Sequence, residues 1–194
     1  LVALCYLGLG AEGFQKRAEG RHSLAVCWLL APYRLAAWIN SRAWTRQHPQ
    51  PDEVLPGLWL GRLPGTAERK ARPELGVLDL CAELPCTEHD DRYASLPLLD
   101  LIAPSVDQCR LGAALIDELR ARGPLLVCCA LGYSRSATVL AAWLLLSGQA
   151  ATVEDALAQV RRARPHIVLK AEQLAVLAQV AGQSQRSREV SHVG

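Results

Sequence analysis

The sequence contains no methionine, a single phenylalanine and no run of basic residues. Its 21 Lys and Arg residues are nearly balanced by 19 Asp and Glu residues, which leaves a net charge of +2. Nucleic-acid-binding domains usually carry a basic patch or stripe, so this composition argues against that class of function. Because methionine is absent and the chain opens inside an apolar run, we expect that the native start of the protein is missing.

The seven cysteines lack the spacing of a disulfide scaffold or a zinc site. Their number is odd, and no Cys-x2-Cys pair is accompanied by suitably spaced histidines. We therefore expect a reducing compartment in which most thiols are buried and inert. His89, Asp90 and Asp91 lie in a polar stretch that is better interpreted as a solvated turn than as a metal site. No metal and no other cofactor is predicted.

Short apolar runs alternate with helical patterns along most of the chain. Runs at 54–61, 76–81, 96–99 and 125–129 predict strands, the first bent by a Pro-Gly turn. Helices are predicted after Ser105, over 138–147, after Thr152 and over about 169–181. The alternation predicts a three-layer α/β fold with a central, mostly parallel sheet and flanking helices, preceded by N-terminal apolar helices. The expected divisions are an N-terminal segment (1–46), a polar linker (47–53), the α/β domain (54–181) and a flexible tail (182–194).

The N-terminal segment, residues 1–46, is apolar and rich in tryptophan. Residues 1–10 are too few to span a bilayer, which takes about 20 residues, and Pro32 and Arg34 interrupt the run at 23–39. Three of the five tryptophans lie within residues 28–44, with arginines between them, a composition that suits a membrane–water interface. We expect membrane attachment through this segment. The alternative is a pair of ordinary helices packed on the α/β domain.

The most informative stretch covers residues 125–137, an apolar strand followed by a short loop and the start of a helix. Within it, five residues separate Cys129 from Arg135, and Ser136 follows. A loop of five residues can turn its backbone N–H groups toward one point, and the helix beginning near Ser136 adds the positive end of its dipole. Such a cradle binds phosphate, lowers the pKa of Cys129 and lets Arg135 clamp phosphate oxygens with two donors. The alternative is a buried structural cysteine beside a surface arginine.

The pattern Cys129-x5-Arg135-Ser136 resembles the signature of cysteine-dependent protein tyrosine phosphatases. The residues from Gly132 to Ser136 resemble the dual-specificity subfamily of those enzymes. The resemblance covers about residues 51–181 and implies hydrolysis of phosphate monoesters through a cysteinyl-phosphate intermediate, without a metal. It also implies that Ser136 assists departure of the sulfur. The phosphate-binding residues are then Ala130, Leu131, Gly132, Tyr133, Ser134 and Arg135.

The reaction also requires an acid that protonates the leaving group and then activates water. Asp100 is the candidate, because it follows a strand 29 residues before Cys129, where the family places a mobile acid loop. Asp107, on the same loop or the first turn of the next helix, is the second choice. Asp79 lies within an apolar strand sequence and is a poorer choice.

One residue departs from the family pattern, because Cys128 stands where a histidine usually precedes the nucleophile. That histidine belongs to the network that orients the loop, so its replacement predicts a higher Cys129 pKa or a slower enzyme. Since neighbouring residues of a strand face opposite sides, we expect Cys128 to point away into the core rather than to form a disulfide with Cys129. The same departure motivates the alternative function, a catalytically weak phosphate-binding docking module.

The substrate predicted from these features is either a phosphotyrosine, phosphoserine or phosphothreonine protein or a membrane phospholipid monoester such as phosphatidylglycerophosphate. None of the five loop residues before Arg135 is basic, which disfavours inositol polyphosphates. An arsenate reductase or sulfurtransferase is disfavoured because the loop lies late in the chain. Leu30–Arg34 and Asn40–Arg42 resemble the segment before the phosphatase domain of bacterial membrane-anchored dual-specificity phosphatases. That resemblance implies a phosphatase domain in the cytoplasm, held at the bacterial inner membrane; it gives no oligomeric state.

Overall fold

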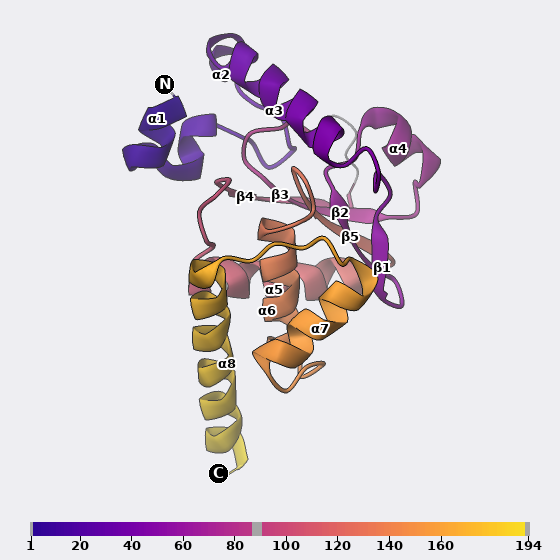
Figure 1. Cartoon of the computed structure of the whole chain (residues 1–194), viewed down its shortest axis with the longest axis vertical. Coiled ribbons are helices and arrows are strands. Elements are labelled where there is room, and N and C mark those ends of the chain that lie inside the picture. The colour runs from indigo at the N-terminus through magenta and orange to yellow at the C-terminus, as the bar shows by residue number, and fades with distance from the viewer. Residues whose placement is uncertain (1, 87–90, 193–194) are drawn as a thin grey trace.

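The computed structural model describes residues 2–86 and 91–192, with side chains described as far as residue 184. Five strands form one mixed sheet in the order β1-β2-β5-β3-β4 (Figure 1). The strands are β1 (Asp52–Leu55), β2 (Leu58–Arg62), β3 (Gly76–Cys81), β4 (Tyr93–Leu98) and β5 (Leu125–Cys129). Only the β1–β2 pairing is antiparallel, and Gly57 takes a positive φ of 74° in the turn between those two strands. The predicted α/β fold with a central sheet is thus confirmed.

The central strand β5 and its neighbour β3 are buried along their whole length. They lie side by side in parallel, and Asp79 is in register with Cys128. A parallel strand covered on both faces is apolar throughout rather than alternating, which explains the sequence pattern at 76–81 and 125–129. Because the carboxyl ends of parallel strands meet at one edge, the segments that follow β3, β4 and β5 converge there.

Four helices lie on one side of the sheet. These are α5 (Val106–Arg120), α6 (Arg135–Leu146), α7 (Val153–Ala163) and α8 (Ala171–His192). Of these, α5, α6 and α7 contact the strands, and α8 packs against those three helices. The predicted caps are present: Ser105 Oγ accepts from the N–H of Gln108 at 3.1 Å, and Thr152 Oγ1 accepts from the N–H of Asp155 at 3.1 Å. Helix α6 is the buried central helix that the apolar run predicted. Helix α8 continues beyond residue 182, where a polar tail was predicted to begin; residues 193–194 of that tail lie outside the described residues.

The opposite face of the sheet carries a smaller apolar cluster, over which α3 (Ala31–Trp44) and the short α4 (Thr66–Ala71) lie (Figure 1). Ala37 of α3 packs against this cluster. Cys128 belongs to it, whereas Cys129 belongs to the main core on the other face. The expectation that Cys128 points away from its neighbour is therefore confirmed, and both cysteines are free thiols.

The N-terminal segment folds into short helices. They are α1 (Val2–Leu4), η1 (Cys5–Leu9), η2 (Gly10–Phe14), α2 (Leu24–Leu29) and α3. Pro32 occupies the first turn of α3, where its missing N–H costs no hydrogen bond, so the apolar run is divided between α2 and α3. Among the described residues, no helix combines the length and the apolar content needed to cross a membrane.

Candidate active site

The loop between β5 and α6 closes around the sulfur of Cys129. The N–H of Gly132 donates to Sγ at 3.3 Å, and the hydroxyl of Ser136 donates to it at 3.2 Å. Cys129 is only 2% exposed. Helix α6 begins at Arg135, so its N-terminal end faces the loop and contributes positive potential to the site. The structure thus brings together the cysteine, the serine and the loop that the sequence predicted.

The loop keeps this shape because its carbonyl oxygens are bonded to groups outside it. Arg164, buried at the end of α7, donates Nε to the Gly132 carbonyl at 3.0 Å and a terminal nitrogen to the Leu131 carbonyl at 3.3 Å. Ser41 of α3 donates its hydroxyl to the Ala130 carbonyl at 2.6 Å. Since the N–H and C=O of a peptide point in opposite directions, carbonyls held outside leave the amides facing the enclosed space.

Gly132 is required by the space available as well as by its backbone angle. Its φ is +73°, and a Cβ placed there would lie 2.3 Å from the carbonyl carbon of Gly61 and 2.7 Å from the nitrogen of Arg62. Both neighbours are backbone atoms of β2, which cannot turn aside as a side chain can. Only glycine therefore lets the loop lie this close to the sheet.

Arg135 lies beside the sulfur and is held by two carboxylates. Its terminal nitrogens pair with both oxygens of Glu83, at 2.8 and 2.6 Å. One of them also donates to the Leu98 carbonyl at 2.8 Å, and the other lies 3.2 Å from Asp100 Oδ1. The guanidinium is 2% exposed, yet its Nε has no hydrogen-bond partner among the described residues. A buried, unpaired cationic donor beside the loop fits an anion with several oxygens, such as phosphate.

The charges in the site favour a reactive sulfur. Burial by itself raises the pKa of Cys129, but Arg135 and the hydrogen bonds from Ser136 and Gly132 outweigh it, so the net pKa is lowered. Glu83 follows the same logic. Burial raises the pKa of Glu83, but the adjoining guanidinium of Arg135 lowers it by more. The net pKa is therefore lowered, which keeps the carboxylate ionised.

The three candidate acids occupy different surroundings. Asp100 follows β4, and its side chain is 40% exposed beside Arg135. The next residue, Leu101, has a positive φ of 62°, an unfavourable backbone conformation for leucine at the turn that aims Asp100. Asp107 is 92% exposed in the first turn of α5, next to Arg110. Asp79 is buried against Lys16. Only Asp100 thus lies in contact with a residue of the cradle.

Cys128 takes no part in the cradle. Its thiol donates to the Leu78 carbonyl at 3.5 Å, on the far face of the sheet, and burial raises its pKa well above the ordinary value. The side chains that hydrogen-bond the carbonyls of the loop are instead Ser41 and Arg164.

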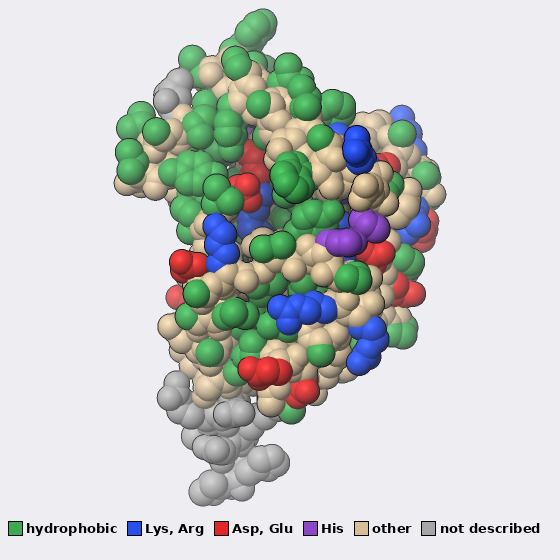
Figure 2. Space-filling view, in the orientation of Figure 1, with side chains coloured by type: hydrophobic (Ala, Val, Ile, Leu, Met, Phe, Trp, Pro, Cys, Tyr) green, Lys and Arg blue, Asp and Glu red, His purple; other side chains and the backbone are tan. Residues whose placement is uncertain are grey.

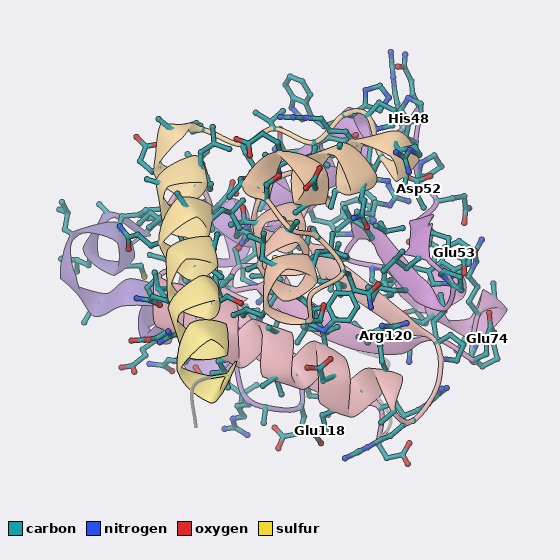
Figure 3. The ribbon with its side chains drawn as sticks, turned by 90° about the horizontal axis from the view of Figure 1, so that it is seen from below. His48, Asp52, Glu53, Glu74, Glu118 and Arg120 are labelled. Atoms are coloured by element: carbon teal, nitrogen blue, oxygen red, sulfur yellow. The ribbon has the colours of Figure 1, made fainter. Side chains whose placement is uncertain are left out.

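Two residues that contact the cradle, Glu83 and Arg164, are not among the residues predicted from the sequence. Glu83 follows β3, and its position just past the end of a strand next to β5 was the available signal. Arg164 carries no sequence motif; its buried guanidinium pairs at 2.6 Å with Asp52 of β1, whose side chain is 40% exposed and is labelled in Figure 3. Among residues 2–86 and 91–192, no group of three or more His, Cys, Asp or Glu is placed to hold a metal; His89 and Asp90 lie outside them.

Comparison with known proteins agrees with this geometry. Residues 83–183 match the family model of the dual specificity phosphatase catalytic domain. Human DUSP28 is similar in structure, with a TM-score of 0.62 and 24% identity over 71% of this chain and 96% of that one. PTPMT1 in complex with PI(5)P has a TM-score of 0.61 and 21% identity over 70% of this chain and 97% of that one. The active form of Tk-PTP has a TM-score of 0.58 and 28% identity over 70% of this chain and 98% of that one. The matched family segment spans just over half of the chain.

Proposed function

The chain belongs to the dual specificity phosphatase family and is a cysteine-dependent phosphatase, and from this premise we propose a role for each residue of its site. The Cys129 thiolate attacks phosphorus while protonated Asp100 gives its proton to the departing ester oxygen, which leaves a cysteinyl-phosphate. The Asp100 carboxylate then takes a proton from water as the water oxygen attacks phosphorus. The sulfur leaves as a thiolate, stabilised by the Ser136 hydroxyl. Loop amides and Arg135 balance the charge on the transferring group throughout.

One observation carries this proposal: a buried sulfur that accepts two hydrogen bonds lies beside a buried arginine whose Nε is unpaired. This combination favours a working enzyme over a docking module. A module that only bound phosphate would need the loop and Arg135, but not a serine directed at the sulfur or an acid at the rim. Both are present, as Ser136 and Asp100.

The roles are tested with the full-length chain and an aryl phosphate under reducing conditions. Cys129→Ser is expected to abolish turnover. Asp100→Asn is expected to lower kcat by about 10²–10⁴-fold, most severely for esters with poor leaving groups, because general acid catalysis contributes that much. Asp107→Asn is the matched control and should leave kcat unchanged, since its carboxylate is exposed next to Arg110. Equal losses in the two aspartate variants would refute the assignment of Asp100.

We also propose that the N-terminal segment holds the enzyme on an anionic phospholipid surface. Figure 2 shows hydrophobic side chains gathered over α1–α3. Ten large apolar side chains of this segment are exposed, and Leu24 and Trp28 are 80% and 82% exposed. The apolar face consists of Leu4, Leu7, Leu9, Leu24, Trp28, Leu29, Leu35, Trp38, Ile39 and Trp44. A patch of this kind marks an interaction site rather than ordinary surface.

Charge favours a membrane surface as the partner. Residues 1–46 contain six Lys and Arg but only two Glu, although the whole chain carries a net charge of only +2. Helices that lie in the plane of a bilayer bury an apolar face and are attracted to anionic headgroups by basic residues beside it. Arg42 of α3 lies over the Trp38 ring at 5.8 Å, which places a cation next to the apolar face.

A phospholipid monoester is the substrate class that this arrangement favours. Helix α3 carries the apolar face and also contacts the phosphate loop through Ser41 and Ala130, so the site opens close to the proposed membrane surface. PTPMT1, a structural neighbour, has been solved in complex with PI(5)P, a phospholipid. The loop of this chain carries no basic residue before Arg135, which suits a headgroup with a single monoester, such as phosphatidylglycerophosphate, rather than a multiply phosphorylated one.

Flotation with vesicles of anionic phospholipid tests the membrane proposal. The wild-type chain should float with the vesicles, and the double variant Leu24→Ser/Trp28→Ser should remain at the bottom. Leu111→Ser is the control, because it removes an exposed leucine (52%) from α5, away from the apolar face. Substrate class is tested by comparing kcat/KM for phosphatidylglycerophosphate in vesicles with that for phosphotyrosine, phosphoserine and phosphothreonine peptides. A higher value for the peptides would reject the lipid assignment.

A further inference from the structure

A lysine from the N-terminal segment is buried inside the α/β domain. Lys16 lies between η2 and α2, and its side chain has no exposed surface. Its ammonium donates to Asp79 Oδ2 at 2.6 Å, to the Cys81 carbonyl at 2.5 Å and to the Leu84 carbonyl at 2.7 Å. These three acceptors use all three donors of the ammonium group. Such a fully satisfied buried cation fixes the groups around it in one arrangement.

The groups that Lys16 fixes lie on both sides of Glu83. The Cys81 carbonyl precedes Glu83 by two residues, and the Leu84 carbonyl immediately follows it. The same N-terminal stretch adds two more contacts to this segment. His22 Nε2 lies 2.8 Å from the Ala82 carbonyl, and the N–H of Cys86 donates to the Gly20 carbonyl at 3.0 Å. Residues 81–86 are therefore held at several points by residues 16–22.

Glu83 is the carboxylate that holds both terminal nitrogens of Arg135. We propose that Lys16 is a positioning residue of the phosphatase reaction, which fixes the backbone around Glu83 and thereby the orientation of Arg135 in the phosphate cradle. This inference rests on the proposed function of the same site. If it holds, the N-terminal segment contributes to catalysis as well as packing against the α/β domain.

The buried ion pair decides which variant gives a clear answer. Burial lowers the pKa of Lys16, but Asp79 and neighbouring groups outweigh it and the net pKa is raised, so the ammonium form is kept. Asp79 is fully buried and also accepts from the Tyr93 hydroxyl at 2.9 Å. Lys16→Met alone would leave this carboxylate buried without a cation, a change that strongly destabilises the folded state. Loss of activity in that variant could then result either from an unstable fold or from the loss of positioning by Lys16.

The double variant Lys16→Met/Asp79→Asn separates them in the full-length chain. It removes both charges in side chains of similar size, so thermal unfolding should occur near the wild-type temperature. The contacts of Lys16 with the Cys81 and Leu84 carbonyls are still lost. We expect kcat/KM for an aryl phosphate to fall tenfold or more. Tyr93→Phe is the matched control, because it removes another hydrogen bond to Asp79 and leaves Lys16 and its carbonyl contacts in place.

A second measurement distinguishes positioning from general damage. The rate of Cys129 alkylation by iodoacetamide, followed by mass spectrometry of the peptide, reports the thiolate as pH is varied. Arg135 stabilises that thiolate. If Arg135 is displaced in the double variant, the midpoint of alkylation should move to higher pH, whereas it should not move in Tyr93→Phe. A folded double variant with a wild-type midpoint would overturn the proposal. A wild-type chain that fails to hydrolyse any phosphate monoester would instead refute the proposed function, while the alkylation result would still test Lys16.

Discussion

Replacement of Glu83 by glutamine removes the charge that holds Arg135 while keeping the shape of the side chain. The two side chains are 5% and 2% exposed, so water cannot take the place of the lost charge. The glutamine oxygen accepts from one terminal nitrogen of Arg135, but its NH2 group then faces the other, and two donors meet. We predict that Glu83→Gln lowers both the stability of the fold and the rate of catalysis.

The magnitude follows from what remains around the guanidinium. Removal of one partner from a buried ion pair costs about 3–5 kcal/mol. The Leu98 carbonyl and Asp100 still contact Arg135, which favours the lower end, about 3 kcal/mol. In a chain of this size, each kcal/mol shifts Tm by about 2–4 °C, so Tm should fall by about 6–12 °C. A lost oxyanion donor costs about 10²–10³ in kcat. Because Arg135 is misoriented rather than removed, kcat should fall by about 10–100-fold.

Thermal unfolding and steady-state hydrolysis of an aryl phosphate measure the two effects. Glu118→Gln is the control, because it makes the same chemical change in Glu118 of α5 (labelled in Figure 3), which forms an exposed pair with Arg122 just beyond the helix. Exposed pairs of this kind contribute about 0–1 kcal/mol, so Tm and kcat should hardly change. If Glu83→Gln behaves like Glu118→Gln in both assays, then Glu83 does not hold Arg135 and the reasoning about the cradle is refuted.

Three further predictions concern the loop and its supports. Gly132→Ala should unfold at a lower temperature and lose most activity, because the left-handed backbone and the overlap with β2 each cost about 1–3 kcal/mol; wild-type kcat in this variant would contradict the tight packing described here. Arg164→Met should lower Tm and raise the KM for aryl phosphates, since the Asp52 pair and two loop-carbonyl contacts are lost, whereas Arg161→Met, on the exposed side of α7, should change neither. The pKa of His22 is lowered to about 4, chiefly by burial, so the folded state resists protonation of this residue. The free energy of unfolding should therefore fall by about 3 kcal/mol as pH drops from about 6.5 to 4. Urea unfolding across this range should show this pH dependence, which should be missing in His22→Asn.

Much of the fold and the centre of the site could be predicted because their signals are local. The strand, loop and helix at 125–137 are contiguous, and the spacing of Cys129, Arg135 and Ser136 alone places them together. The apolar run at 76–81 coincides with β3 because a strand covered on both faces needs such a run. Asp100 was predicted because it follows a strand 29 residues before Cys129, where the family that the sequence resembles places its acid loop, and the structure places its carboxylate 3.2 Å from Arg135.

The supports of the site could not be predicted, because their partners lie far away in the sequence. Glu83 is 52 residues from Arg135, Lys16 is 63 residues from Asp79 and Arg164 is 112 residues from Asp52. No periodicity or spacing links such pairs, and each of these residues is of a charged type that is common on protein surfaces. The N-terminal helices show the same limit. Their apolar residues predicted an attachment to a membrane or to the domain, whereas the contact with the loop is made by Ser41, a small polar residue.

The close packing of the nucleophile loop on β2 also constrains how the protein can diverge. Gly132 lies against the backbone of Gly61, and a Cβ on Gly61 would in turn lie 2.9 Å from Pro51. A side chain gained at either glycine would require several segments to shift at once, which single mutations cannot supply. Leu131 and Tyr133, by contrast, are partly exposed within the same loop. Descendants of this sequence should therefore acquire new substrates through positions 131 and 133, while both glycines persist in every lineage that remains active.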